Sequence, residues 1–142
     1  MPNAFITSAL TVAAGLVLYG ATQLAQRFWL DPVTDLMKAL GRASYAAFYY
    51  ANVYTSPGVV RDDLAAEASK ELRKCASELL AALRTVRSYW VFRVLGQLPP
   101  KGDVQRAAGL LIGLSNASKM DDTRDAWKEA DELRSILGLP KR

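Results

Sequence analysis

The sequence begins with a long stretch that carries no charged side chain. Residues 4–26 contain no Asp, Glu, Lys or Arg, and all 18 basic and 14 acidic side chains lie at or beyond Arg27. As a helix, this stretch would be roughly 34 Å long, enough to cross a hydrocarbon core about 30 Å thick. We therefore predict a transmembrane anchor over residues 1–30 and a second domain over residues 31–142.

Two other interpretations of the uncharged stretch stay open. A cleaved secretory signal normally has a basic N-terminal region and a small-x-small cleavage site, whereas the nearest candidate site here begins with the bulky Tyr19. A core helix of a soluble protein is the stronger alternative, because hydroxyl and amide side chains make the stretch only moderately apolar. These side chains are Thr7, Ser8, Thr11, Thr22, Gln23 and Gln26.

The flanking residues predict the orientation of the anchor. No basic side chain precedes it, and Arg27, Lys38 and Arg42 follow it, so the positive-inside rule places the N-terminus outside and the second domain in the cytoplasm, at the inner membrane. Phe28 and Trp29 fall where an interfacial aromatic belt would lie. Alternatively, these two rings pack on the cytoplasmic domain.

One face of the predicted anchor carries small residues at a spacing of four. Thr7, Thr11 and Gly15 form this ridge. Because lipid supplies no hydrophobic drive for helix association, small residues favour close approach of two spans. The ridge predicts either a homo-oligomer or docking onto a partner membrane protein.

The composition excludes several kinds of site. The chain has no His and a single Cys, which rules out His-dependent catalysis, His-bearing zinc sites and an intrachain disulfide. No Gly-rich phosphate loop occurs. Cys75 lies on an apolar helical stripe, and the acidic clusters Asp62-Asp63 and Asp121-Asp122-Asp125 lie at predicted helix starts, where the helix dipole favours them. We predict no cofactor and no metal.

Helical periodicity and stop signals predict an all-α fold, with about four amphipathic helices in a small cytoplasmic bundle. The first helix starts at Asp31-Pro32 and ends before Ser56-Pro57-Gly58, with Met37 and Phe48 among its inward residues. A helix over 61–87 follows, with Cys75 in its stripe. A third spans 103–117, where Gly109 and Gly113 predict a close helix contact. The last runs from Asp121 to Gly138, with Trp127 among its apolar residues.

The interval from Arg84 to Arg106 has a net charge of +4, which equals that of the whole chain. Within it, aromatic side chains lie between basic ones, which favours an anionic membrane surface. The residues of this predicted surface are Arg84, Arg87, Tyr89, Trp90, Phe92 and Arg93. The alternatives are that the rings complete the core, or that the patch binds nucleic acid, which we consider the weaker option.

Two phrases, FYYANVYTSPG (48–58) and GLLIGLSNAS (109–118), resemble small bacterial single-span, membrane-anchored helical proteins of unknown function. The resemblance implies a bacterial source and one anchor, and it brings no catalytic motif. The favoured function is therefore a non-enzymatic, membrane-anchored interaction or scaffold subunit that contacts membrane lipids. A pore-forming or membrane-perturbing effector is the alternative, because polar side chains in the span could line a channel. A small enzyme and a nucleic-acid binder rank lower.

Overall fold

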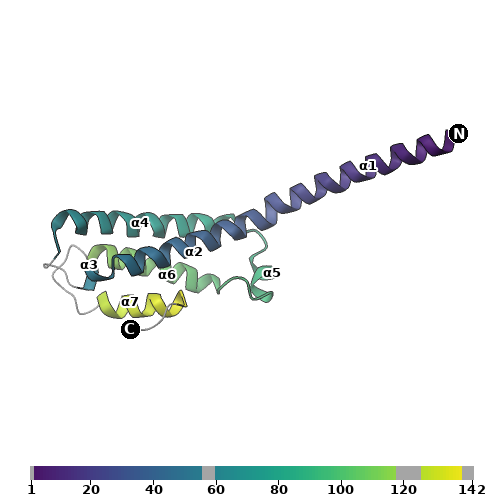
Figure 1. Ribbon diagram of the computed structural model, residues 1–142. Coiled ribbons are helices and arrows are strands. Elements are labelled where there is room, and N and C mark those ends of the chain that lie inside the picture. The colour runs from purple at the N-terminus through teal and green to yellow at the C-terminus, as the bar shows by residue number, and fades with distance from the viewer. Residues whose placement is uncertain (1, 56–59, 118–125, 139–142) are drawn as a thin grey trace.

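Every secondary-structure element in the described part of the chain is helical. The computed structural model describes residues 2–55, 60–117 and 126–138, with side chains from Ile6 onward. The elements are α1 (Pro2–Ala25), a π-helical turn (Gln26–Leu30), α2 (Asp31–Tyr49), α3 (Ala51–Thr55), α4 (Asp62–Thr85), α5 (Tyr89–Val94), α6 (Lys101–Ala117) and α7 (Ala126–Ile136). The predicted all-α fold is confirmed (Figure 1).

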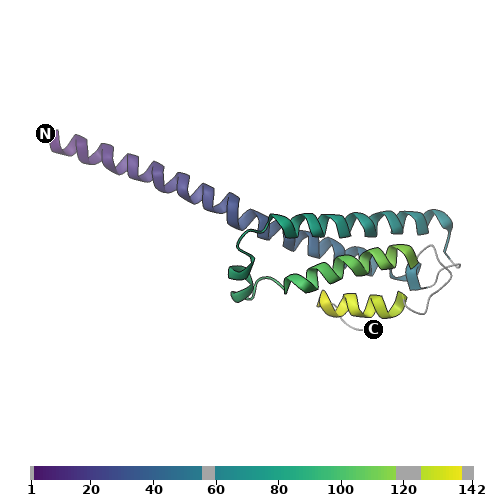
Figure 2. The same cartoon turned by 180° about the vertical axis from the view of Figure 1, so that it is seen from behind.

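The bundle consists of α2, α4, α6 and α7, and α1 projects away from it. α4 packs against both α2 and α6, while α7 packs on α6. Figure 2 shows that α1 leaves the bundle at the end where α5 lies. The short α3 lies at the opposite end (Figure 1). The molecule is therefore a helical bundle with one long apolar helix protruding from it.

Apolar side chains at helical spacing form the core. On α6, the residues predicted to point inward are all buried: Val104, Ala107, Ala108, Leu111, Leu114 and Ser115. The predicted stripe of α4 is buried from Ala68 to Leu83. The side chains that α2 turns toward the core are mostly small: Ala39, Ala43, Ala46 and Ala47. Such small side chains let neighbouring helix axes come close together.

The predicted helix start at Asp31 and Pro32 is wrong, because the helix continues through both residues. Asp31 has helical dihedral angles (φ −59°, ψ −46°), and its N–H donates to the carbonyl of Gln26, five residues earlier. Pro32 has no N–H, and a proline ring crowds the carbonyl four residues before it, here that of Phe28. The π-helical turn absorbs this conflict, as π-bulges do, so one helix runs from Ile6 to Tyr49.

Two large side chains that were predicted to face the core, Met37 and Phe48, are exposed instead, and so is Trp127 of the last helix. The exposed fractions are 49% for Met37, 69% for Phe48 and 54% for Trp127. On α2, the neighbouring Leu36 and Ala47 are buried. This helix therefore buries a side made of Val33, Leu36 and alanines, and it leaves Met37 and Phe48 exposed.

The helix α6 begins two residues before the predicted cap at Asp103. The carbonyl of Pro100 accepts hydrogen bonds from the N–H groups of Asp103 and Val104, so the helical turn is already formed at Lys101. Asp103 still lies in the first turn, where its charge complements the helix dipole. The helix thus starts about half a turn earlier than predicted. The favourable interaction of Asp103 with the helix dipole is nevertheless retained.

The two glycines of α6 differ in their surroundings. A Cβ added at Gly109 would meet nothing within 4 Å, so the predicted close contact is wrong at this position. A Cβ added at Gly113 would lie 2.5 Å from Oε2 of Glu129 on α7, which confirms a close approach there. Gly138 ends α7 with a φ of +68°, as its glycine identity predicted.

Two predicted helix boundaries are wrong. The helix predicted to end before Ser56 is interrupted at Tyr50, between α2 and α3, and α4 ends at Thr85 instead of Arg87, because Val86 is extended. Asp62 and Asp63 lie in the first turn of α4, as predicted. The predicted stop at Ser56-Pro57-Gly58 and the acidic residues Asp121, Asp122 and Asp125 lie outside the described residues.

Candidate functional site

The long apolar helix α1 is not covered by the rest of the described chain. It is long and apolar enough to cross a membrane, and none of its most apolar window is buried. Large side chains such as Leu16, Val17 and Leu18 are 67–73% exposed. Within the described residues, Ile6–Ala25 is therefore not a core helix enclosed by the bundle. Length and composition alone do not distinguish a span from a signal sequence.

The predicted ridge lies on this exposed helix. The Thr11 hydroxyl donates to the carbonyl of Thr7 at 2.9 Å, one turn earlier, and Thr22 does the same to Leu18 at 2.8 Å. These bonds satisfy the two hydroxyls within the helix itself. A Cβ added at Gly15 would meet nothing within 4 Å, so the ridge is open to an approaching backbone.

The predicted interface belt lies in and beside the π-helical turn, where α1 joins the bundle. Phe28 is 52% exposed and Trp29 is 57% exposed. The guanidinium of Arg87 lies 5.8 Å from the centroid of the Phe28 ring, which is within range of a cation–π interaction. The structure thus brings together one residue of the predicted belt and one residue of the predicted membrane surface. Sequence reasoning treated them as separate sites.

The predicted membrane surface divides into two parts on α5. Tyr89 and Phe92 are buried, so these two rings belong to the core and not to the predicted membrane surface. Trp90 is 71% exposed, and Arg93 is exposed beside it. The separation follows from helical spacing, because positions 89 and 92 share one side of the helix and positions 90, 93 and 94 share another.

The position of α5 is held by specific contacts. The Tyr89 hydroxyl donates to the carbonyl of Pro99 at 2.7 Å. At the other end, Gly96 has a φ of +70°, and the N–H of Gln97 donates to the carbonyl of Phe92 at 2.9 Å. The N–H of Gly96 bonds to Arg93, which completes a Schellman motif. The exposed side of α5 is therefore presented by an ordered turn.

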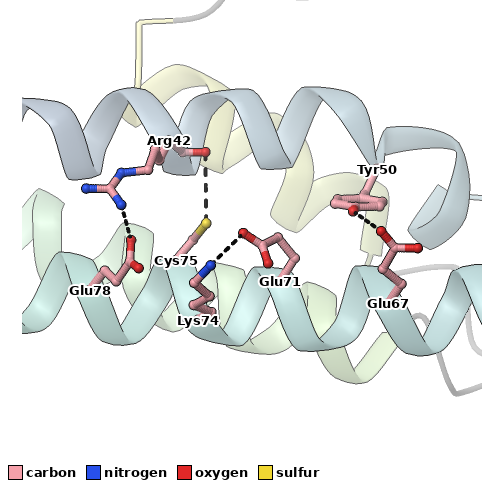
Figure 3. Close-up of polar contacts among 7 residues, drawn as sticks. All are labelled: Arg42, Tyr50, Glu67, Glu71, Lys74, Cys75 and Glu78. Atoms are coloured by element: carbon pink, nitrogen blue, oxygen red, sulfur yellow. Dashed lines mark hydrogen bonds and ion pairs between the residues drawn. The ribbon is translucent and has the colours of Figure 1, made fainter.

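A second candidate region is the cleft between α2 and α4 (Figure 3). This cleft has a volume of about 450 Å³, and its lining includes Tyr45, Tyr49, Glu67 and Cys75. The Tyr45 and Tyr49 rings stack with centroids 5.6 Å apart. Tyr50 and Tyr54 are buried, whereas Tyr45 and Tyr49 are exposed.

The polar contacts across this cleft hold α2 and α4 together. Arg42 pairs with Glu78 at 3.1 Å, and the Tyr50 hydroxyl donates to Oε1 of Glu67 at 3.2 Å, which ties α2 to α4 (Figure 3). The Cys75 thiol points to the carbonyl of Arg42 at 4.0 Å.

The thiol lacks the features of a nucleophile. Burial raises the pKa of Cys75, and the nearby carboxylates of Glu71 and Glu78 raise it further. A thiol needs a lowered pKa and solvent access to react readily, so Cys75 acts as a small core residue. The described residues also contain no group of three or more Cys, Asp or Glu side chains that could hold a metal ion.

Comparison with known proteins adds no relative. No protein-family model matches the chain, and no curated protein or solved structure shows significant similarity to it.

Proposed function

We propose that this chain is a bacterial single-span membrane protein that holds a helical domain at the inner membrane and serves as a non-enzymatic interaction or scaffold subunit. In this proposal α1 crosses the bilayer with its N-terminus outside, and the bundle lies in the cytoplasm. The observation that carries the proposal is the exposure of α1, whose apolar side chains are not covered by any described part of the chain. Complete burial of one such side chain contributes roughly 1.5–3 kcal/mol.

The continuity of α1 with α2 gives the proposed anchor a mechanical role. The helix from Ile6 to Tyr49 is unbroken, and the core residues of the bundle all lie at or beyond Val33. A rigid connection of this kind would pass the orientation of the span directly to the bundle. A flexible linker would let the two parts move independently.

Membrane insertion is tested by extraction of membranes with alkaline carbonate, together with the intact mass of the extracted protein. We expect the protein to stay in the membrane pellet with residues 1–30 still attached. Release into the soluble fraction, or loss of the N-terminal segment by cleavage, would contradict an anchored protein. The second result would favour a secretory signal.

Association through the span is tested by the oligomeric mass of the detergent-solubilised protein. We expect wild-type protein to be an oligomer and Gly15→Leu to dissociate it, because leucine would hold two backbones apart at the ridge. Gly20→Leu is the matched control, since Gly20 also has nothing within 4 Å of its Cβ position but faces another direction. A monomeric wild-type protein would contradict homo-oligomerisation and leave docking onto a partner span.

The pore-forming alternative has less support. Thr11 and Thr22 use their hydroxyls on their own helix, so neither requires a water-filled channel. Ion leakage from vesicles containing the protein, lost in Gly15→Leu but kept in Gly20→Leu, would favour the pore over the scaffold.

A further inference from the structure

The exposed side of α5 carries an unusual concentration of large apolar side chains. Trp90 is 71% exposed, Val94 is 79% exposed and Leu95, directly after the helix, is 64% exposed. The opposite side of the same short helix is fixed in the core through Tyr89 and Phe92. Because this turn is ordered, the exposed rings and methyl groups are held in place rather than collapsing onto the bundle.

Three basic side chains lie on or next to the same segment of the chain. Arg84 lies in the last turn of α4, Arg87 lies between α4 and α5, and Arg93 lies in the last turn of α5. All three are exposed. Within residues 2–55, 60–117 and 126–138, no carboxylate forms an ion pair with any of them. The patch is therefore both apolar and uncompensated in charge.

The patch also lies at the end of the bundle from which α1 departs. The contact between Arg87 and Phe28 joins the end of α4 to the π-helical turn. In both views α5 lies at this end, away from the end that carries α3 (Figures 1 and 2). If α1 spans a bilayer, the π-helical turn falls near the membrane surface, and α5 comes to the same level.

We propose that this patch, formed by Phe28, Arg84, Arg87, Trp90, Arg93 and Val94, is a docking surface for an anionic lipid bilayer. This inference rests on the proposed span of α1. Trp90 and Val94 insert at the boundary between headgroups and acyl chains, while the three arginines bind lipid phosphates. The docking surface adds a second attachment point to the span, and two points of attachment fix the angle between the bundle and the membrane.

The positive charge of the patch favours an anionic bilayer over a second copy of the chain as its binding partner. A second copy seated symmetrically on the patch would place arginines opposite arginines, which is repulsive. An anionic bilayer supplies the complementary charge, and its interfacial region accommodates tryptophan and aliphatic side chains.

The test uses full-length protein in bilayers that contain a lipid carrying a fluorescence quencher on the upper part of its acyl chain. With Trp29→Phe and Trp127→Phe, Trp90 is the single fluorophore. We expect strong quenching in bilayers of mixed phosphatidylcholine and phosphatidylglycerol, and weaker quenching in phosphatidylcholine alone. Replacing Arg84, Arg87 and Arg93 by Gln should lower the ratio of docked to undocked molecules on the order of 100-fold.

Two controls make the result specific. Trp127 as the single fluorophore should stay unquenched, because α7 begins at the end of the bundle far from α1 (Figure 1). The variant Arg61→Gln/Lys70→Gln/Lys74→Gln removes the same charge from three exposed positions, two on α4 and one at its N-cap, and it should leave the quenching of Trp90 unchanged.

The outcomes separate this inference from the proposed function. A Leu16→Trp probe, in a chain without other tryptophans, should be quenched by a lipid labelled near the end of its acyl chain, and failure there would overturn the span. If the probe at position 16 is quenched but Trp90 is not, the span stands and the docking surface is wrong. Protection of Trp90 from an aqueous quencher without quenching by lipid would assign the patch to a protein partner and overturn the inference. Equal quenching of Trp90 in both bilayers would overturn its preference for anionic lipid.

Discussion

The guanidinium of Arg87 lies over the ring of Phe28, 5.8 Å from its centroid. The two residues are far apart in sequence, and each belongs to a different part of the molecule. Phe28 lies in the π-helical turn at the base of the protruding helix, and Arg87 follows α4, which returns from the far end of the bundle. The contact therefore braces the junction between the apolar helix and the bundle.

A double-mutant cycle measures the strength of this brace. We expect Phe28→Ala and Arg87→Ala to show a coupling free energy of about 0.5–1 kcal/mol, the range for a solvent-exposed cation–π pair. The measurement is denaturant unfolding of full-length protein in a mild detergent. Trp29→Ala paired with Arg87→Ala is the control cycle. Coupling as large in the control as in the Phe28 cycle would mean that the ring contact is not specific.

The packing of α6 makes a second prediction. Leu111→Ala should lower the free energy of unfolding by about 2–5 kcal/mol, because Leu111 is fully buried and the substitution leaves a cavity. Ile112→Ala, at a position that is 42% exposed, should cost less than about 1 kcal/mol. Chemical denaturation of the two variants checks both values. An equal loss of unfolding free energy in the two variants would show that the buried side of α6 is wrongly assigned.

The glycines of α6 provide a matched pair. Gly109→Ala should raise the free energy of unfolding by about 0.5–1 kcal/mol, because Gly109 is an exposed helical position with open space at its Cβ. Gly113→Ala should gain less or lose stability, since the new methyl group would meet the carboxylate of Glu129 at 2.5 Å. Thermal melting of the two variants side by side measures the two changes in stability. A larger gain at position 113 would contradict the close approach of α6 and α7.

The Cys75 thiol should react slowly with a disulfide reagent at neutral pH. Burial and neighbouring carboxylates raise its pKa and keep it protonated, so reaction requires local opening of the bundle. We expect a rate at least about 100-fold below that of the unfolded chain. Ser77→Cys in a Cys75→Ala background places the thiol on the exposed side of α4 and should react rapidly. Equal rates at the two positions would show that position 75 is accessible.

Alkaline pH should destabilise the bundle through Tyr54. Burial raises the pKa of Tyr54 above its ordinary value of 10.0, and its hydroxyl donates to the carbonyl of Ala47. The folded state therefore keeps this proton to higher pH than the unfolded state does. The resulting stabilisation is fully present below the unfolded pKa and is lost as pH rises from there through the folded pKa.

The measurement is the free energy of unfolding between about pH 7 and about pH 11. Tyr54→Phe should be less stable at neutral pH by about 1 kcal/mol, because a hydrogen bond is lost, and its stability should fall less steeply above about pH 10. Tyr45→Phe, at a position 67% exposed, should retain the wild-type slope. An unchanged slope in Tyr54→Phe would assign the alkaline loss to other groups.

Local sequence pattern predicted the helices well, but it misplaced several faces. The buried residues of α6 follow directly from the spacing of Val104, Ala107 and Leu111. On α2, by contrast, helical spacing placed Met37 and Phe48 on the same inward face as Leu36 and Ala47, and the structure buries Leu36 and Ala47 but exposes the other two. The hydrophobicity of a residue does not show which side of a helix is buried. On α2, that side is determined by how closely α4 packs against it.

The sequence predicted some residues of the candidate site but not how they are arranged. The basic and aromatic residues between Arg84 and Arg93 were recognised as one set, but helical geometry then separated Tyr89 and Phe92 from Trp90. Pro32 was interpreted as a helix start, although a proline can also distort a helix that continues through it. The contact of Phe28 with Arg87 has no local signal in the sequence, because it depends on how two distant helix ends meet.

The sequence by itself determined that the chain is all-helical, that its leading segment is free of charge, and that the His-dependent sites considered above are impossible. These properties depend on residue type and short-range spacing, which are visible along the chain. Only the tertiary structure decided that α1 projects from the bundle with its apolar side chains exposed, that it continues into α2 through a π-helical turn, and that α5 exposes both Trp90 and Arg93. Those properties arise from contacts between distant segments, where shape and available space override the preference of any single residue.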